Sequence, residues 1–171
     1  MPDGAVAIRP IAIGMVTLRG LPDVTGPALQ AIGLPGVPER RMRVAANGLA
    51  ALWMSPDEVM VTCGPGEGAA VAGRLRDAVG DAFGTAIDMS AARQAFALGG
   101  GDVSDMLSAL MPVDFDRLAP EEVRRTRMAQ VPVALWRDGD EWRLICFRSV
   151  AAYAEALLRS AAQAEGRPAG G

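Results

Sequence analysis

The first residues that could perform chemistry are an acidic pair, Asp57-Glu58, in the stretch LWMSPDEVMVTC at residues 52–63. Two neighbouring carboxyl groups can act as general acid and general base when their surroundings hold their pKa values apart. This pair directly follows Ser55-Pro56, a turn-forming dipeptide between two apolar runs. Acids at the tip of a hairpin stay in water and keep ordinary pKa values. The sequence therefore favours a polar hairpin tip over a catalytic pair.

Two residue types that enzymes commonly use are missing. The chain contains no histidine, and all 17 basic residues are arginine. This excludes Ser-His-Asp and Cys-His nucleophiles, HExxH metal sites, the phosphate-loop lysine and Schiff-base lysines. Cys63 and Cys146 lie in separate apolar runs without CxxC spacing, so we expect buried free thiols. Catalysis would be left to carboxylates, hydroxyl groups and Tyr153.

A glycine-rich segment and two arginine clusters could bind anions. LGGGDVSDML, residues 98–107, is expected to be a strand-to-helix junction, but Asp102 at its N-cap puts a negative charge there and favours a tight turn. The arginine clusters fit strand edges, where charge discourages pairing between sheets, or a patch for an acidic partner. No aromatic residue interleaves with them, and the net charge is −3, which argues against nucleic acid. The clusters are Arg40, Arg41 and Arg43, and Arg124, Arg125 and Arg127.

The elements that hold these residues repeat along the chain. Shifting the sequence by 83 residues places LWMSPDEVMVTC over LWRDGDEWRLIC at residues 135–146. Trp53 and the acidic pair then coincide with Trp136 and Asp140-Glu141. A helical apolar pattern follows each stretch, so we predict hairpin–helix units at 42–83 and 125–163. An acidic pair present in both copies is better explained by hairpin architecture than by one catalytic site.

Within the second hairpin, a turn at Asp138-Gly139 would place Leu135 opposite Trp142, Val133 opposite Leu144 and Val131 opposite Cys146 on one apolar face. We predict a single α+β domain over residues 1–165, with antiparallel sheets and helices on one face of each. Residues 166–171 are predicted to be a disordered tail.

Length and composition agree with one domain that has its own core. The chain has 171 residues, of which half are hydrophobic. Its N-terminal apolar run is interrupted by Arg9, Pro10 and Arg19, so we expect neither a secretory signal nor a membrane span. These features indicate a cytoplasmic protein that binds neither nucleic acid nor membrane.

Three segments resemble the gamma subunit of heterotetrameric sarcosine oxidase. They are LWMSPDEVMV, AIDMSAARQAFALGGGDVSDMLSALMPVDF and VPVALWRDGDEWRLICFRSVAAYAEALL. The similarity runs from around Met15 to around Gln163, nearly the whole chain. Its most specific parts are Trp53-x-x-Pro56-Asp57-Glu58, Asp88-x-Ser90 followed by Arg93, and Phe147-Arg148-Ser149.

The resemblance implies a fold and a role. That family's complex oxidises sarcosine to glycine, passes electrons through flavins to oxygen and transfers the released one-carbon unit to tetrahydrofolate. Its large subunits carry FAD, FMN and NAD, and its smallest subunit carries zinc. The gamma subunit is similar in fold to the folate-binding domain of the glycine-cleavage aminomethyltransferase, with duplicated ferredoxin-like halves. The resemblance therefore implies no catalytic, cofactor-binding or metal-binding residue in this chain.

On this basis we expect an accessory subunit that contacts mainly the alpha subunit and also the beta and delta subunits. Large aromatic residues near loops are typical interface anchors. Two other functions stay open: a stand-alone folate-dependent aminomethyltransferase, which would need a positioned acid such as Asp88 or Asp114, and a small-ligand-binding module that retains an anion. The interface candidates are Trp53, Pro56, Asp57, Glu58, Trp136 and Arg148.

Overall fold

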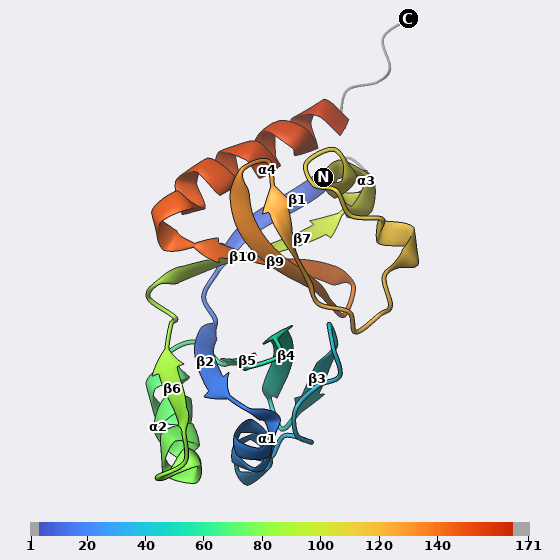
Figure 1. Ribbon diagram of the computed structural model, residues 1–171. Coiled ribbons are helices and arrows are strands. Elements are labelled where there is room, and N and C mark those ends of the chain that lie inside the picture. Colours follow the sequence, from blue (N-terminus) through green and yellow to red (C-terminus); the bar gives the residue numbers. More distant parts are fainter. Residues whose placement is uncertain (1–3, 166–171) are drawn as a thin grey trace, which may run out of the picture. The chain divides into compact units, whose positions relative to one another are not determined.

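The computed structural model describes residues 4–165, so the predicted tail lies outside the described residues. The chain divides into two compact units, each with its own sheet (Figure 1). Within the described residues, unit 1 comprises 4–11, Ala92–Pro120 and 124–165, and unit 2 comprises Ala12–Ala91 and Glu121–Val123.

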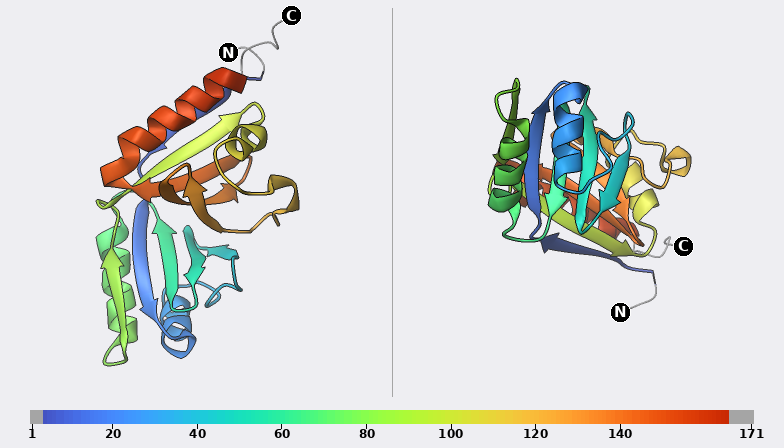
Figure 2. Two further views of the ribbon diagram at one scale, coloured as in Figure 1. Left: turned by 45° about the horizontal axis from the view of Figure 1, so that its top comes forward. Right: turned by 90° about the horizontal axis from the view of Figure 1, so that it is seen from below.

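Unit 2 is a five-stranded antiparallel sheet with two helices on one face (Figure 2). Apolar residues alternate along its strands, so that Val16 and Leu18 enter the core with Leu29 and Leu75 of the helices. The strands are β2 (Gly14–Gly20), β3 (Arg43–Ala46), β4 (Leu49–Ser55), β5 (Glu58–Cys63) and β6 (Gly84–Asp88), in the order β3-β4-β5-β2-β6, and the helices are α1 (Pro22–Ala31) and α2 (Gly68–Val79).

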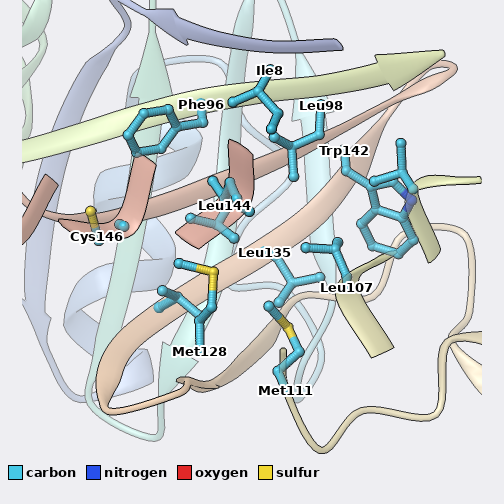
Figure 3. Close-up of a cluster of buried hydrophobic side chains, with 14 of the residues drawn as sticks. Ile8, Phe96, Leu98, Leu107, Met111, Met128, Leu135, Trp142, Leu144 and Cys146 are labelled. Carbon is cyan, nitrogen blue, oxygen red and sulfur yellow. The ribbon is translucent and has the colours of Figure 1, made fainter. Parts of the chain in front are cut away.

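Unit 1 also has a five-stranded antiparallel sheet, and its core lies between this sheet and its helices (Figure 3). Phe96, Leu135 and Leu144 from three adjacent strands meet there, together with Leu158 from the last helix. The strands are β1 (Val6–Ile11), β7 (Arg93–Gly100), β8 (Arg124–Met128), β9 (Val131–Asp138) and β10 (Glu141–Phe147), in the order β1-β7-β10-β9-β8. The helices are α3 (Val103–Ser108) and α4 (Ala151–Glu165), with 3-10 turns η1 (Phe115–Arg117) and η2 (Arg148–Val150).

The two units share one topology. Matching β8, β9, β10, β7 and β1 to β3, β4, β5, β2 and β6 makes the two strand orders identical. The outer strand is the exception in chain order, because β6 follows its unit's last helix whereas β1 precedes its whole unit. The predicted α+β fold of two related halves with antiparallel sheets is confirmed.

The second hairpin has the predicted apolar face but not the predicted pairs. Leu135 lies opposite Leu144, and Asp138 opposite Glu141, so the turn residues are Gly139 and Asp140. Gly139 has a φ of 63°, the positive value that a two-residue turn requires at its first central position and that glycine adopts without steric cost. The pairing therefore differs from the predicted pairing by two residues. Side chains alternate between the two faces with a period of two, so the same side chains stay on the core face.

The first hairpin keeps this turn but adds a bulge. Ser55 lies opposite Glu58, exactly 83 positions before Asp138 and Glu141. The register then shifts between Trp53 and Ser55, which puts Trp53 opposite Val59. The repeat therefore holds at the turn, whereas the aligned tryptophans of the two copies do not occupy equivalent pairing positions.

Candidate functional site

The hairpin between β4 and β5 places the two acids of the first candidate pair in different surroundings, one exposed and one buried. The Asp57 side chain is 60% exposed, and its Oδ1 accepts a hydrogen bond from Ser55 Oγ at 2.7 Å. This hydrogen bond is the main reason why the pKa of Asp57 lies below its ordinary value. A general acid needs the opposite shift, so the lowered pKa argues against that role. The expected solvated tip is correct for Asp57.

Glu58 is buried instead, which corrects the expectation of a solvated pair. It is the first residue of β5 and lies opposite Arg19 of β2. Arg19 Nη2 is 2.6 Å from Glu58 Oε2, and this guanidinium also reaches Asp57 at 3.8 Å. This ion pair between a buried carboxylate and a guanidinium joins β5 to β2 at the end of the sheet.

The equivalent glutamate of the second hairpin, Glu141, binds two arginines. Its carboxylate accepts hydrogen bonds from Arg143 at 2.7 Å and from Arg9 of β1. A Cβ atom on Gly99 would lie 3.1 Å from Glu141 Oε1, so the glycine in β7 leaves room for the carboxylate to reach β1. The hydrogen bonds from Arg143 and then Arg9 lower the pKa of Glu141. Both hairpin glutamates thus connect strands.

The lowered pKa of Glu141 predicts a loss of stability in acid. A carboxyl group whose pKa is lower in the folded state stabilises the fold above its ordinary value of 4.5, and this contribution disappears as the pH falls through the folded pKa. Glu141→Gln should lower the free energy of unfolding at pH 7 by less than about 1 kcal/mol. The difference from wild type should shrink below pH 4.5, as followed by urea unfolding across pH. A difference independent of pH would contradict this prediction.

Asp88 and Ser90 form a hydrogen-bonded corner after β6. Asp88 Oδ1 accepts from Ser90 N–H at 3.0 Å and from Ser90 Oγ at 2.6 Å, and Ser90 Oγ accepts from Met15 N–H at 2.9 Å. The Asp88 carboxylate fills the space where a Cβ on Gly68 would lie, at the positive end of helix α2. Asp88 therefore has a structural role at this corner.

Asp114, the other acid considered for transferase chemistry, is exposed. Its side chain is 62% accessible, and it lies 3.8 Å from Arg117 in a surface ion pair. Asp88 and Asp114 are both exposed, whereas a catalytic acid usually needs burial or a close charged partner. The transferase alternative therefore gains no support from either residue.

Arg148 joins the end of β10 to the start of β7. Its backbone N–H donates to the Ala92 carbonyl at 2.9 Å, and its guanidinium donates to Gln94 Oε1 at 3.0 Å and to the Arg93 carbonyl at 2.7 Å. The Arg93 guanidinium lies 5.8 Å from the centre of the Phe147 ring. Two segments singled out in the sequence thus meet at one exposed junction of unit 1.

The interface candidates belong to both units and differ in exposure. Trp53, Pro56 and Asp57 belong to unit 2 and retain exposed surface, and Arg148 is exposed in unit 1. Trp136 is only 3% exposed and Glu58 only 7%. A buried side chain offers little area to another protein, so the exposed members are the better contact candidates.

The glycine-rich junction is a capped turn, and members of both arginine clusters lie on edge strands. Asp102 accepts a hydrogen bond from the Asp105 N–H at 3.0 Å and caps α3, as predicted. Arg43 lies on edge strand β3, near Glu121 at 3.5 Å. The second cluster, Arg124, Arg125 and Arg127, lies on edge strand β8. This placement agrees with charge that protects sheet edges.

Residues 4–165 contain neither a metal-binding group of side chains nor a helix that could span a membrane. No group of three or more His, Cys, Asp or Glu side chains there could hold a metal ion. No helix in that range has the length and hydrophobicity needed to cross a membrane.

Both cysteines are buried free thiols, as predicted. Burial, and then the charges of Glu67 and Asp88, raise the pKa of Cys63 to about 11, and burial raises that of Cys146. Since the thiolate is the nucleophile, we expect neither thiol of the native chain to react with iodoacetamide at pH 8. Mass spectrometry should find both alkylated in guanidinium chloride. Alkylation of the native chain at the rate of the unfolded chain would contradict this prediction.

Sequence reasoning missed two of the exposed large apolar side chains of unit 2, Phe83 and Leu21. Phe83, in the turn before β6, is 97% exposed, and Leu21, before α1, is 64% exposed. The sequence held a signal for each: Phe83 stands next to Gly84 beyond the helix, and Leu21 directly precedes Pro22. Neither position belongs to an amphipathic pattern that would bury it.

Comparisons with known proteins give a consistent result. The model of the sarcosine oxidase, gamma subunit family matches residues 21–165. The chain is 36% identical over 144 residues to the sarcosine oxidase subunit gamma of Arthrobacter sp, covering 81% of this chain and 70% of that protein. It is 35% identical over 153 residues to the same subunit from Corynebacterium sp. (strain U-96), covering 84% and 72%.

Solved structures agree with this result. A chain of the heterotetrameric sarcosine oxidase from Corynebacterium sp. U-96, solved in complex with pyrrole 2-carboxylate, matches with a TM-score of 0.90 and 26% identity, over 100% of this chain and 90% of that one. The glycine cleavage system aminomethyltransferase T from Bartonella henselae matches with a TM-score of 0.71 and 13% identity, over 91% and 46%. The second likeness concerns the fold alone.

Proposed function

The chain belongs to the sarcosine oxidase gamma subunit family, and we propose that it serves as the gamma subunit of a heterotetrameric sarcosine oxidase. The observation that carries this proposal is the match along the whole chain, with a TM-score of 0.90, to a chain of such an oxidase. A small domain that matches one chain of a four-subunit enzyme from end to end is expected to assemble in the same way.

Within that complex we propose an accessory role for this chain. The acids that could have acted in catalysis are held in structural contacts: Asp57 by Ser55, Glu58 by Arg19, and Asp88 by Ser90. The oxidation of sarcosine to glycine, with one-carbon transfer to tetrahydrofolate, would then take place on the other subunits. FAD, FMN, NAD and zinc would be bound there as well.

We further propose that the alpha subunit is the main contact and that the complex is cytoplasmic. An accessory subunit acts through its contacts with the other subunits, and only exposed side chains can make such contacts. The exposed interface candidates of both units are therefore the first to test. These are Trp53, Pro56 and Asp57 in unit 2 and Arg148 in unit 1.

The test is purification of the tagged chain from its own cells grown on sarcosine. We expect three further subunits in the eluate, identified by mass spectrometry as those of sarcosine oxidase, and a flavin absorbance spectrum. Sarcosine-dependent oxygen consumption of the same eluate provides a second readout. An untagged strain carried through the same column is the control.

A colourless eluate that contains only the 17.8 kDa chain would contradict the proposal. Titration of that chain with tetrahydrofolate would then decide between the two alternatives. Specific folate binding would favour a transferase-like protein, and an anion retained through purification would favour a ligand-binding module.

A further inference from the structure

Three exposed apolar residues lie at one end of the sheet of unit 2. Gly20 and Gly84 are paired between β2 and β6, so their neighbours Leu21 and Phe83 flank the same point of the sheet. The Gly20 N–H donates to the Asp57 carbonyl at 3.0 Å, which places the hairpin tip beside them. We call Leu21, Phe83 and the exposed Pro56 the tip surface.

The fold does not require large apolar residues at these positions. Gly100 pairs with Val6 in unit 1 as Gly20 pairs with Gly84 in unit 2. The positions of unit 1 that correspond to Leu21, Phe83 and Pro56 are accordingly Gly101, Ala5 and Gly139. The related sheet thus ends in small residues where unit 2 places a phenylalanine and a leucine in water.

These side chains are costly to leave exposed. Phe83 is 97% and Leu21 64% exposed, whereas large apolar side chains stabilise a protein or a complex when they are removed from water. Single exposed apolar residues are ordinary, but adjacent large ones commonly mark a contact with another protein. Aromatic residues are also the usual anchors of protein interfaces.

An exposed aspartate stands within two residues of each member of the tip surface along the chain. Asp23 follows Leu21 by two residues, Asp81 precedes Phe83 by two, and Asp57 follows Pro56, and all three are exposed. The nearby cation, Arg19, is already ion-paired with Asp57 and Glu58. A partner that binds this surface should therefore contact the apolar residues with apolar side chains and contact the surrounding aspartates with arginine or lysine residues.

We propose that the tip surface is a docking site for another subunit of the heterotetramer, which binds through an apolar segment flanked by basic residues. This inference rests on the proposed function and specifies its interface. A second copy of this chain is a poor occupant, because related tip surfaces would bring aspartates against aspartates and supply no lysine. The charge of these aspartates thus selects a partner of opposite charge.

The first test compares variants of the tagged chain in its own cells. Leu21→Ser with Phe83→Ser should weaken retention of the other subunits by about tenfold or more, since two buried contacts are lost. Asp23→Arg with Asp81→Arg should also weaken retention. Tyr153→Ser is the matched control, because Tyr153 is 52% exposed on α4 of unit 1, and it should retain the subunits as wild type does.

A second test places a photo-crosslinking benzoylphenylalanine at position 83 of the assembled complex. We expect a covalent product with another subunit, at a peptide that contains apolar residues next to arginine or lysine. A crosslink to a second copy of this chain, or to no protein at all, would overturn the inference. The same residue placed at position 153 is the control.

The outcomes separate the inference from the proposed function. Wild-type retention by both pairs of variants would overturn the inference and leave the subunit assignment intact. Recovery of wild-type chain without any other subunit would overturn both. Leu21 and Phe83 lie mainly in water, and serine at position 21 supplies a favourable N-cap for α1. Thermal unfolding of the serine variant should therefore occur at a temperature no lower than that of wild type, so that lost retention reports on docking.

Discussion

Replacing Phe96 by alanine is expected to lower the free energy of unfolding of unit 1 by about 3–5 kcal/mol. Phe96 is 1% exposed and lies between Pro10 of β1 and Leu144 of β10 in the sheet register. The substitution removes an aromatic ring from a packed core and leaves a cavity that neighbouring side chains fill only in part. Urea unfolding, with hydrogen exchange of β7 and β10 as the local readout, measures the effect.

Phe83 provides the matched control. It is the same residue type at 97% exposure, so Phe83→Ala should change the free energy of unfolding by less than about 0.5 kcal/mol. A loss below about 1 kcal/mol for Phe96→Ala would contradict the core assignment. A large loss for Phe83→Ala would show that this side chain supports the fold and would weaken its assignment to an interface.

Gly14→Ala is expected to destabilise unit 2 by about 1–3 kcal/mol, because the new methyl group has no free space. A Cβ atom there would overlap Cys63 Sγ and would lie 2.9 Å from the Gly64 carbonyl oxygen and 3.2 Å from the Gly68 nitrogen. Two of these neighbours are backbone atoms, so relief requires β2 to move away from the loop before α2. Thermal or urea unfolding should reveal the loss.

Gly73→Ala is the matched control, and it should change the free energy of unfolding in the opposite direction. Gly73 lies within α2, and a Cβ there would meet only the flexible end of Arg76 at 3.9 Å. Alanine in a helix interior is favoured over glycine by about 1 kcal/mol, so this variant should be more stable than wild type. Equal effects at the two positions would contradict the predicted crowding at Gly14.

Most of the fold could be predicted from local patterns. Apolar alternation located both hairpins, and the offset of 83 residues predicted the relation between the halves that the common strand order confirms. The pairing of the second hairpin could not be predicted, because Gly139 can occupy either central position of a two-residue turn. The bulge beside Trp53 was also missed, because no proline or glycine in β4 marks it.

The candidate site was predicted less completely. The hairpin acids were found, but the sequence pattern did not distinguish exposed Asp57 from Glu58, whose burial depends on Arg19, a residue distant in sequence. Leu21 and Phe83 each have a local sequence signal of exposure, but their position at one end of the sheet follows from the pairing of Gly20 with Gly84 across two strands. Long-range register, which one sequence does not reveal, decided both outcomes.

The most direct test of the subunit assignment is the native mass spectrum of the intact complex purified through this chain. We predict one dominant assembly that contains a single 17.8 kDa copy of this chain together with three other subunits. Collision-induced release of the chain would confirm its place in the assembly. A spectrum of the free chain alone, or of an assembly made only of its own copies, would contradict the assignment.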